Sequence, residues 1–331
     1  SSPELTVSSV AALAGQPQIG LGDALGSNVV NIALIFGLAL LYGAVPTSRG
    51  DFGRDYYLAL AVPVLTLVFA VDGQIARAEA LLLIVAFVVV PATASSYLFS
   101  AILIPFVIMS LAALGVNILI GYCGQISLGS GAFMAVGAYG AYNIIMRVPG
   151  VPLVVALILG GVCAMLFGIL FGLPSLRVKG LYLAVATLAA QFFLDWAFLR
   201  VGWISNNSTS GSVSVAGLSF LGIPVATPQA KYWLCLGFVV VFGFAAKNLV
   251  RSHIGREWMA IRDMDVAAAV IGIRPVYAKL SAFAVSSFIV GVAGALWGFV
   301  HLGSWEPLAF GIDRSFQLLF MVIIGGLGSI M

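Results

Sequence analysis

The sequence predicts an all-α, polytopic helical membrane protein. Of its 331 residues, 62% are hydrophobic and only 8% are charged, and the mean hydropathy is +1.13. These values lie far outside the range of soluble globular domains. The apolar runs are long and continuous, which indicates spanning helices and not the alternating ten-residue segments of an outer-membrane barrel.

About ten apolar segments follow one another along the chain, and we expect most of them to cross a bilayer as helices. The segments are 29–45, 56–71, 79–92, 97–120, 131–146, 151–173, 180–200, 232–250, 279–301 and 315–331. The three cysteines are scattered and two lie inside apolar runs, which favours small packing residues over a disulfide or metal framework.

The positively charged residues predict the orientation of these segments. Six cations lie from Lys247 to Lys279, whereas Gly202–Ala230 contains no Lys or Arg. Because cytoplasmic loops are enriched in Lys and Arg, we place the loop 250–279 in the cytoplasm and Gly202–Ala230 outside.

The cationic loop also predicts a short helix of its own. Helix formers fill the stretch from Gly255 to Gly272. Four residues are available for an apolar face: Ile261, Val266, Ala269 and Val270. We expect an amphipathic helix at the membrane surface. A solvated helical loop without a partner is the alternative that the spacing leaves open.

Residues 121–131, GYCGQISLGSG, interrupt the apolar pattern with four glycines and no charge. Irregular backbone at membrane depth is tolerated where it lines a cavity or is buried in protein, so this stretch predicts a broken helix. Tight helix packing through small residues is the alternative. Glycines 137, 140, 291 and 294 fit that packing role.

Five stretches, in this order, resemble the permease subunits of branched-chain amino acid ABC transporters, of the LivM-like branch. They are GYCGQISLGSGAFMAVGAYGA (121–141), LPSLRVKGLYLAVATLA (173–189), HIGREWMAIRDMDVAAAVIGI (253–273), KLSAFAVSSFIVGVAGALWG (279–298) and MVIIGGLGSI (321–330). The resemblance implies a multi-pass subunit of a bacterial inner membrane that imports branched-chain or related amino acids.

The resemblance also implies partners and site residues. The expected partners are a second permease subunit, two cytoplasmic ATP-binding subunits, a periplasmic amino acid-binding protein and the lipid bilayer, with no nucleic acid. The residues expected beside the translocation path are Gly124, Gln125, Ser127 and Gly129. Those expected to couple to the ATPase are Gly255, Arg256, Ala260, Ile261, Arg262, Asp263 and Gly272.

The coupling stretch is expected to act as one rigid helix bounded by glycines. In this interpretation Arg256 and Arg262 make polar contacts with the ATPase. Ala260, Ile261 and Ala268 supply a small apolar surface that seats in a groove on it.

The chain itself is not expected to be an enzyme. It has no GxxxxGK[ST] phosphate-binding motif, so ATP hydrolysis is not expected in this chain. The resemblance implies that partner subunits hydrolyse ATP, and no cofactor is expected here. It also has no HExxH motif and no paired carboxylates within the apolar runs, and we expect no functional metal site. Asp195 is interpreted as a snorkelling or ion-paired residue.

The N-terminal stretches SSPEL (1–5) and GDALGSNVVNI (22–32), with the apolar runs that follow, resemble one alpha-repeat of the sodium/calcium exchanger superfamily. That resemblance implies that Glu4 coordinates a cation with Asn28 nearby, and a calcium/cation antiporter is the alternative function. Such exchangers build one site from two inverted repeats, and the sequence contains no second PEL or GSN copy. In the alternative view Ser1–Leu5 is a helix start.

Two regions follow from these resemblances. Residues 1–92 form a partial exchanger-like membrane region, and residues 93–331 form a permease region. The junction indicates either a gene fusion or an assembly error. The chain opens without Met and stops in GGLGSIM, so we expect it to be a fragment.

Overall fold

The computed structural model describes residues 96, 99–173, 181–206, 208, 210–215, 219–220, 223–224 and 227–325. These residues belong to the unit Val62–Met331. The predicted segments 29–45, 56–71 and 79–92 lie outside them, as do Glu4 and Asn28.

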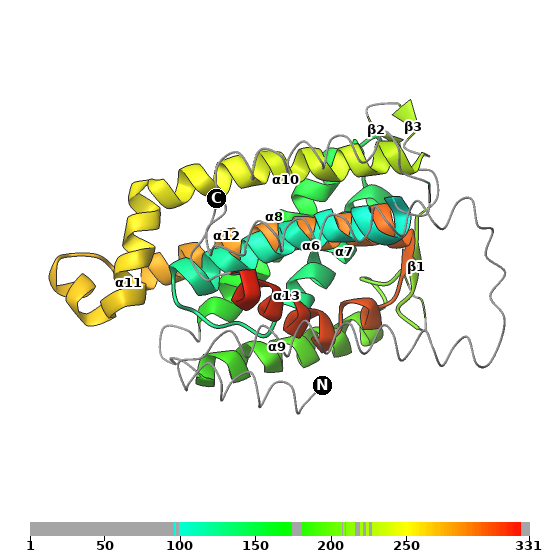
Figure 1. The fold of residues 1–331 in the computed structure, drawn as a ribbon. Helices are drawn as coiled ribbons and strands as arrows, with labels where there is room; N and C mark the ends of the chain where they lie inside the picture. The colour runs from blue at the N-terminus through cyan, green and yellow to red at the C-terminus, as the bar shows by residue number, and fades with distance from the viewer. Residues whose placement is uncertain are drawn as a thin grey trace, which may run out of the picture. The chain divides into compact units, whose positions relative to one another are not determined.

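All seven apolar segments predicted from residue 97 onward form helices (Figure 1). They are α6 (Ile104–Asn117, with π-helical turns η1, Phe99–Leu103, before it and η2, Ile118–Tyr122, after it), α7 (Ser130–Arg147), α8 (Leu153–Gly172), α9 (Leu181–Arg200), α10 (Pro228–Arg251), α12 (Pro275–Leu296, continued by η4, Trp297–Leu302) and α13 (Ile312–Gly325). An eighth helix, α11 (His253–Val270), occupies the cationic loop.

Within the described residues, five helical stretches are long and apolar enough to cross a membrane. They are Phe99–Tyr122, Leu153–Gly172, Tyr182–Arg200, Pro228–Arg251 and Pro275–Leu302. The protein is thus a multi-pass helical membrane protein, while the predicted count of about ten apolar segments is not confirmed.

The short strands and α11 lie at opposite ends of the long helices (Figure 1). Strand β1 (Val213–Ser214) pairs antiparallel with β4 (Ser304–Trp305), placing Val213 opposite Trp305. Strands β2 (Ser219–Phe220) and β3 (Ile223–Pro224) form a second pair, and a 3-10 turn, η5 (Pro307–Phe310), precedes α13. The cation-rich loop and the cation-free loop are therefore at opposite ends, as the predicted orientation requires.

The core forms where α7, α8 and α12 pack through glycine. A Cβ at Gly137 of α7 would overlap the carbonyl oxygen of Gly291 on α12, and a Cβ at Gly160 of α8 would overlap the carbonyl oxygen of Gly137. Because bilayer lipid is as apolar as the side chains, helices in a membrane associate through close packing. Small residues let the helix backbones approach closely enough for this. The packing role predicted for Gly137 and Gly291 is confirmed.

Side-chain hydrogen bonds and a glycine set the two ends of α10 and the turn into α11. Thr227 and Pro228 begin α10, with the Thr227 hydroxyl accepting a hydrogen bond from Ala230 N–H (3.3 Å). The helix ends at Arg251, and the hydroxyl of the next residue, Ser252, donates to the Leu249 carbonyl (2.6 Å). A Cβ at Gly255 would overlap the Val250 carbonyl oxygen, so glycine is required for so tight a change of direction.

Candidate functional site

The helix break predicted within GYCGQISLGSG is present. The turn η2 ends at Tyr122 and α7 begins at Ser130, so residues 123–129 form an irregular connection. We name residues 121–129, which include the end of η2, the α6–α7 segment. Gly124 has φ +68°, in the left-handed region that favours glycine. Gly124 N–H bonds to the Ile120 carbonyl (3.1 Å), and Gln125 N–H bonds to the Leu119 carbonyl (3.0 Å). This closure resembles a Schellman motif widened by one residue, as the end of a π-helical turn requires.

The α6–α7 segment ends at the N-terminus of α7. Three polar side chains from α9 and α13 accept hydrogen bonds from backbone N–H groups there. Their acceptor atoms satisfy the N–H groups of Leu128 (Thr187 Oγ1, 2.9 Å), Gly131 (Ser315 Oγ, 2.7 Å) and Ala132 (Gln191 Oε1, 2.6 Å). The first N–H groups of a helix have no partner within that helix. Because Thr187 and Gln191 lie inside the apolar stretch Tyr182–Arg200, α7 begins beside the interior of a spanning helix.

Gln191 joins α9 to three other helical elements at this point, since its Oε1 also accepts from the Ser315 hydroxyl of α13 (3.3 Å). It is fully buried, and besides accepting from Ala132 it donates to the Phe310 carbonyl (3.1 Å) and to Asp195 Oδ1 (3.1 Å). Asp195 in turn lines an open cavity of about 200 Å³ with Glu306 and Leu308. Asp195 is hydrogen-bonded to Gln191, and its interpretation as a snorkelling or ion-paired residue stays a prediction.

Sequence reasoning missed Thr187, Gln191 and Ser315. A signal was present in α9, since Thr187, Gln191 and Asp195 recur every four residues on an otherwise apolar helix and therefore share one face. Polar side chains in a spanning helix commonly bond across to neighbouring helices. Ser315 offered no comparable signal.

Replacing Gln191 by leucine is expected to lower the free energy of unfolding by about 2 kcal/mol, because the Ala132 N–H and the Phe310 carbonyl lose their buried partner. The midpoint of thermal unfolding in detergent measures the loss. Gln317→Leu is the control, since Gln317 accepts only an exposed hydrogen bond from Arg314 (2.8 Å). Equal destabilisation by the two substitutions would contradict a bridging role for Gln191.

The four residues expected beside the translocation path occupy different environments on the segment. Gly124 is exposed and Gln125 is half-buried, whereas Ser127 and Gly129 are buried. The Ser127 hydroxyl accepts from Gly129 N–H (3.3 Å), and a Cβ at Gly129 would lie 2.8 Å from the Thr187 carbonyl oxygen. Ser127 and Gly129 therefore hold the segment in place, and Gly124 and Gln125 remain accessible.

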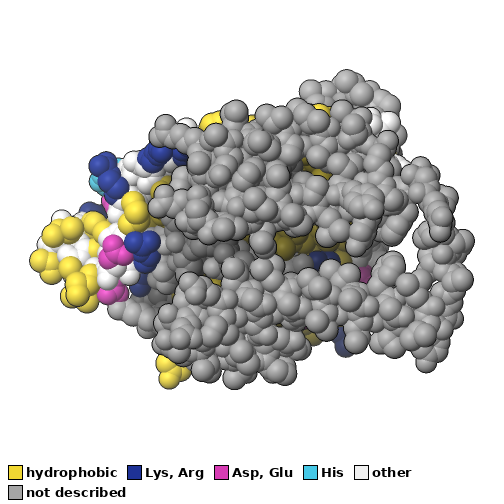
Figure 2. Space-filling view, viewed as in Figure 1, with side chains coloured by type: hydrophobic (Ala, Val, Ile, Leu, Met, Phe, Trp, Pro, Cys, Tyr) yellow, Lys and Arg dark blue, Asp and Glu magenta, His cyan; other side chains and the backbone are white. Residues whose placement is uncertain are grey.

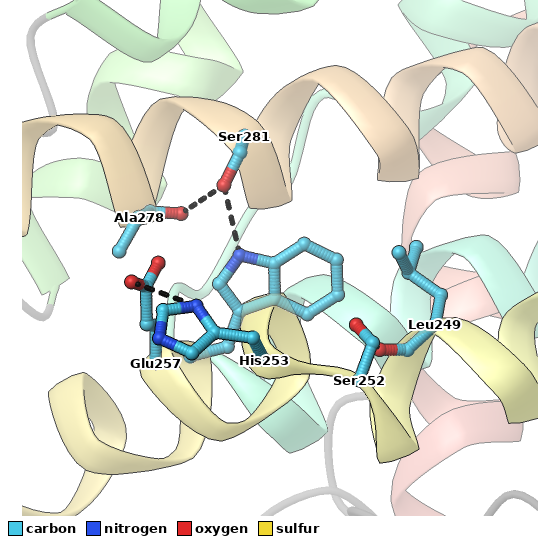
Figure 3. Close-up of polar contacts among 7 residues, drawn as sticks. Leu249, Ser252, His253, Glu257, Ala278 and Ser281 are labelled. Carbon is cyan, nitrogen blue, oxygen red and sulfur yellow. Dashed lines mark hydrogen bonds and ion pairs between the residues drawn. The ribbon is translucent and has the colours of Figure 1, made fainter.

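Helix α11 packs its apolar face against its own chain. Trp258, Ile261 and Ala268 are buried, and Trp258 Nε1 donates to the Ser281 hydroxyl of α12 (2.9 Å; Figure 3). The Ser281 hydroxyl donates in turn to the Ala278 carbonyl (2.9 Å). Ile261 and Ala268 are therefore covered by this chain itself, and their contact with an ATPase stays a prediction. Ala260 is half-buried against the same core.

The prediction of one rigid helix from Gly255 to Gly272 needs correction. The helix begins at His253, two residues before Gly255, and its backbone breaks at Met264 (φ −159°, ψ 95°). Gly272 lies just after the helix with φ +94°. Two shorter helical pieces therefore meet at Met264.

Beyond the break, α11 carries exposed apolar side chains that we name the α11 tip. Its members are Met264 (70% exposed), Val266 (70%), Val270 (83%) and Ile271 (75%). Figure 2 shows hydrophobic side chains gathered at this end, beside acidic and basic ones. A contiguous exposed apolar group marks an interaction surface more often than a free surface.

The charged residues predicted to couple to a partner divide into two kinds. Arg256 is exposed. Arg262 instead makes contacts inside the chain: Nη1 donates to the Gly121 carbonyl (2.9 Å) and Nε pairs with Asp263 Oδ1 (2.9 Å). Sequence reasoning also missed that Lys279, counted only as a loop cation, is buried and lies 3.9 Å from Asp265 Oδ2.

Comparisons with known proteins divide the chain in two. The family model described as branched-chain amino acid transport system / permease component matches residues 98–331. The sodium/calcium exchanger protein model matches residues 1–96. The predicted boundary at 92/93 stays a prediction, and no solved structure matches the chain.

Individual relatives show the same division. The LivM permease proteins of the high-affinity branched-chain amino acid transport systems of Salmonella typhimurium and Escherichia coli are each 29% identical over 243 residues, covering 65% of this chain and 56% of theirs. The chain thus spans about half the length of these relatives. CaxA of Alkalimonas amylolytica, which is named as an antiporter, is 35% identical over 88 residues, covering 27% of this chain and 28% of its own. Because the permease model covers more than half of the residues, the chain belongs to the family of permease components of branched-chain amino acid transport systems.

Proposed function

We propose that this chain is a transmembrane permease subunit of an ATP-driven importer for branched-chain or related amino acids in a bacterial inner membrane. The observation that carries the ATP-driven part is the α11 tip. It projects beyond the spanning helices at the cation-rich end of the molecule, which the positive-inside rule assigns to the cytoplasm.

The proposed assembly has a second permease subunit, two cytoplasmic ATP-binding subunits and a periplasmic amino acid-binding protein. An ATP-binding subunit would cover the α11 tip, burying Val266 and Val270 in the helix-in-groove manner. The anchored face around Trp258 would then carry its movement into α12. The opposite end, with β1 and β4, would face the binding protein.

Within the membrane, the proposed path runs beside the α6–α7 segment. Gly124 and Gln125 are its accessible residues, and irregular backbone of this kind is tolerated where it lines a cavity. Ser127 and Gly129 would support the path from behind. No residue of this chain is proposed to perform catalysis or to hold a cofactor, because ATP would be hydrolysed by the partners.

Transport by the reconstituted complex tests the proposal. Proteoliposomes containing this chain, its sister permease and the ATP-binding subunits are loaded with ATP, and binding protein with radiolabelled leucine is added outside. We expect uptake that requires both ATP and the binding protein. Leucine uptake that a sodium gradient drives equally well without ATP would contradict the proposal.

The same vesicles test the antiporter alternative, which the match of residues 1–96 to the exchanger model favours. We expect no calcium uptake under a sodium or proton gradient, because one alpha-repeat supplies only half of such a site. Gradient-driven calcium uptake that Glu4→Gln abolishes would support the exchanger function.

A further inference from the structure

The contact between α11 and the α6–α7 segment joins the two parts of the candidate site. Arg262 lies on α11, and the carbonyl that it binds belongs to Gly121, 141 residues earlier in the chain. A Cβ at Gly124 would lie 3.0 Å from Arg262 Cγ. The side chain therefore lies along the backbone of the segment as well as bonding to it.

The hydrogen-bond pattern at the end of η2 explains why the Gly121 carbonyl can bind an arginine side chain. In an ordinary Schellman closure the glycine N–H bonds to the carbonyl three residues earlier, which here would be Gly121. The widened closure uses Ile120 and Leu119 instead. The Gly121 carbonyl is then available to a side chain, and a cation at the negative end of a helix is the favoured partner.

Two further contacts lie close to Arg262, on either side of the break in α11. Asp263 orients the guanidinium through Nε (2.9 Å), and the backbone breaks at the next residue, Met264. On the far side of the break Asp265 lies beside the buried Lys279 of α12. A push on the α11 tip is thus applied directly beside the Arg262 contact.

We propose that Arg262 is a positioning residue that fastens α11 to the α6–α7 segment, so that displacement of the α11 tip by an ATP-binding subunit moves the segment. The fastening itself requires only this chain, while its use in coupling rests on the proposed function. The movement would pass from Arg262 to Gly121–Gly124, and from there towards the N-terminus of α7.

Cys123 is a native reporter for this contact. It lies two residues after Gly121 and is buried, so in the closed segment a thiol reagent reaches it slowly. Cys235 on α10 is equally buried and reports general loosening of the fold.

The first experiment uses this chain alone in detergent. Maleimide labelling of each cysteine is followed by peptide mass spectrometry in wild type, Arg262→Gln and Arg256→Gln. We expect Cys123 labelling to rise about tenfold in Arg262→Gln only, the equivalent of about 1.4 kcal/mol, with Cys235 unchanged. Unchanged Cys123 labelling, or an equal rise at Cys235, would overturn the proposal.

The second experiment uses the assembled complex. Addition of a non-hydrolysable ATP analogue is expected to change Cys123 labelling several-fold in wild type and not in Arg262→Gln. The same response in both would show that α11 does not act through Arg262. Because the first experiment needs no partner, failure of the fastening is distinguished from failure of the proposed function.

Discussion

Gly137→Ala is expected to lower the free energy of unfolding by about 3 kcal/mol, the upper part of the usual range for overpacking. The added methyl would overlap the carbonyl oxygen of Gly291. That atom belongs to the backbone of α12 and cannot rotate away as a side chain does. Helices α7 and α12 would have to separate along their shared interface.

The control for this substitution is Gly243→Ala on α10. A Cβ at Gly243 meets no atom within 4 Å, and both glycines lie within helices, so the intrinsic gain in helix propensity is shared. Thermal unfolding in detergent and resistance to sodium dodecyl sulfate are measured for both variants. A Gly137→Ala protein as stable as Gly243→Ala would show that α7 and α12 do not pack as described.

Val270→Asp is expected to weaken retention of the ATP-binding subunits about a hundredfold while leaving the isolated chain folded. Val270 is 83% exposed, so the carboxylate stays hydrated until a partner covers it. Burying it unpaired in an interface would then cost on the order of 3 kcal/mol, a factor of about a hundred in the dissociation constant. Co-purification of the subunits and ATP-dependent leucine uptake measure the effect.

Leu308→Asp is the matched control, because Leu308 is 80% exposed and lies on η5, at the other end of the molecule. We expect it to retain the ATP-binding subunits at the wild-type level. Equal retention by Val270→Asp would indicate that lipid headgroups or nothing at all cover the α11 tip. Ala260 is less suited to this test, since it packs against the core of its own chain and a charge there would also disturb folding.

The sequence alone determined the class of the protein and the order of its elements. Apolar runs of spanning length require helices because the bilayer offers no partner to exposed backbone groups. For the same reason the glycine-rich, uncharged stretch 121–131 predicted a helix break that the structure contains. These properties follow from composition and local spacing, and no distant contact is needed to read them.

Only the tertiary structure decided which face of α11 is free. Spacing put Ile261 and Val270 on the candidate apolar surface together, but the break at Met264 separates them, and Ile261 is buried within the chain whereas Val270 is exposed. The exposed face and the anchored face have similar composition. Their roles differ because the face around Trp258 packs against α12, whereas the α11 tip is exposed.

The partners of the helix break were likewise set by tertiary structure. The Ala132 N–H is satisfied by Gln191, 59 residues away, and the Gly131 N–H by Ser315, 184 residues away. The sequence shows that α7 must have its first N–H groups satisfied. Which side chains satisfy them depends on how α9 and α13 pack against α7, because a hydrogen bond depends on distance in space and not on separation along the chain.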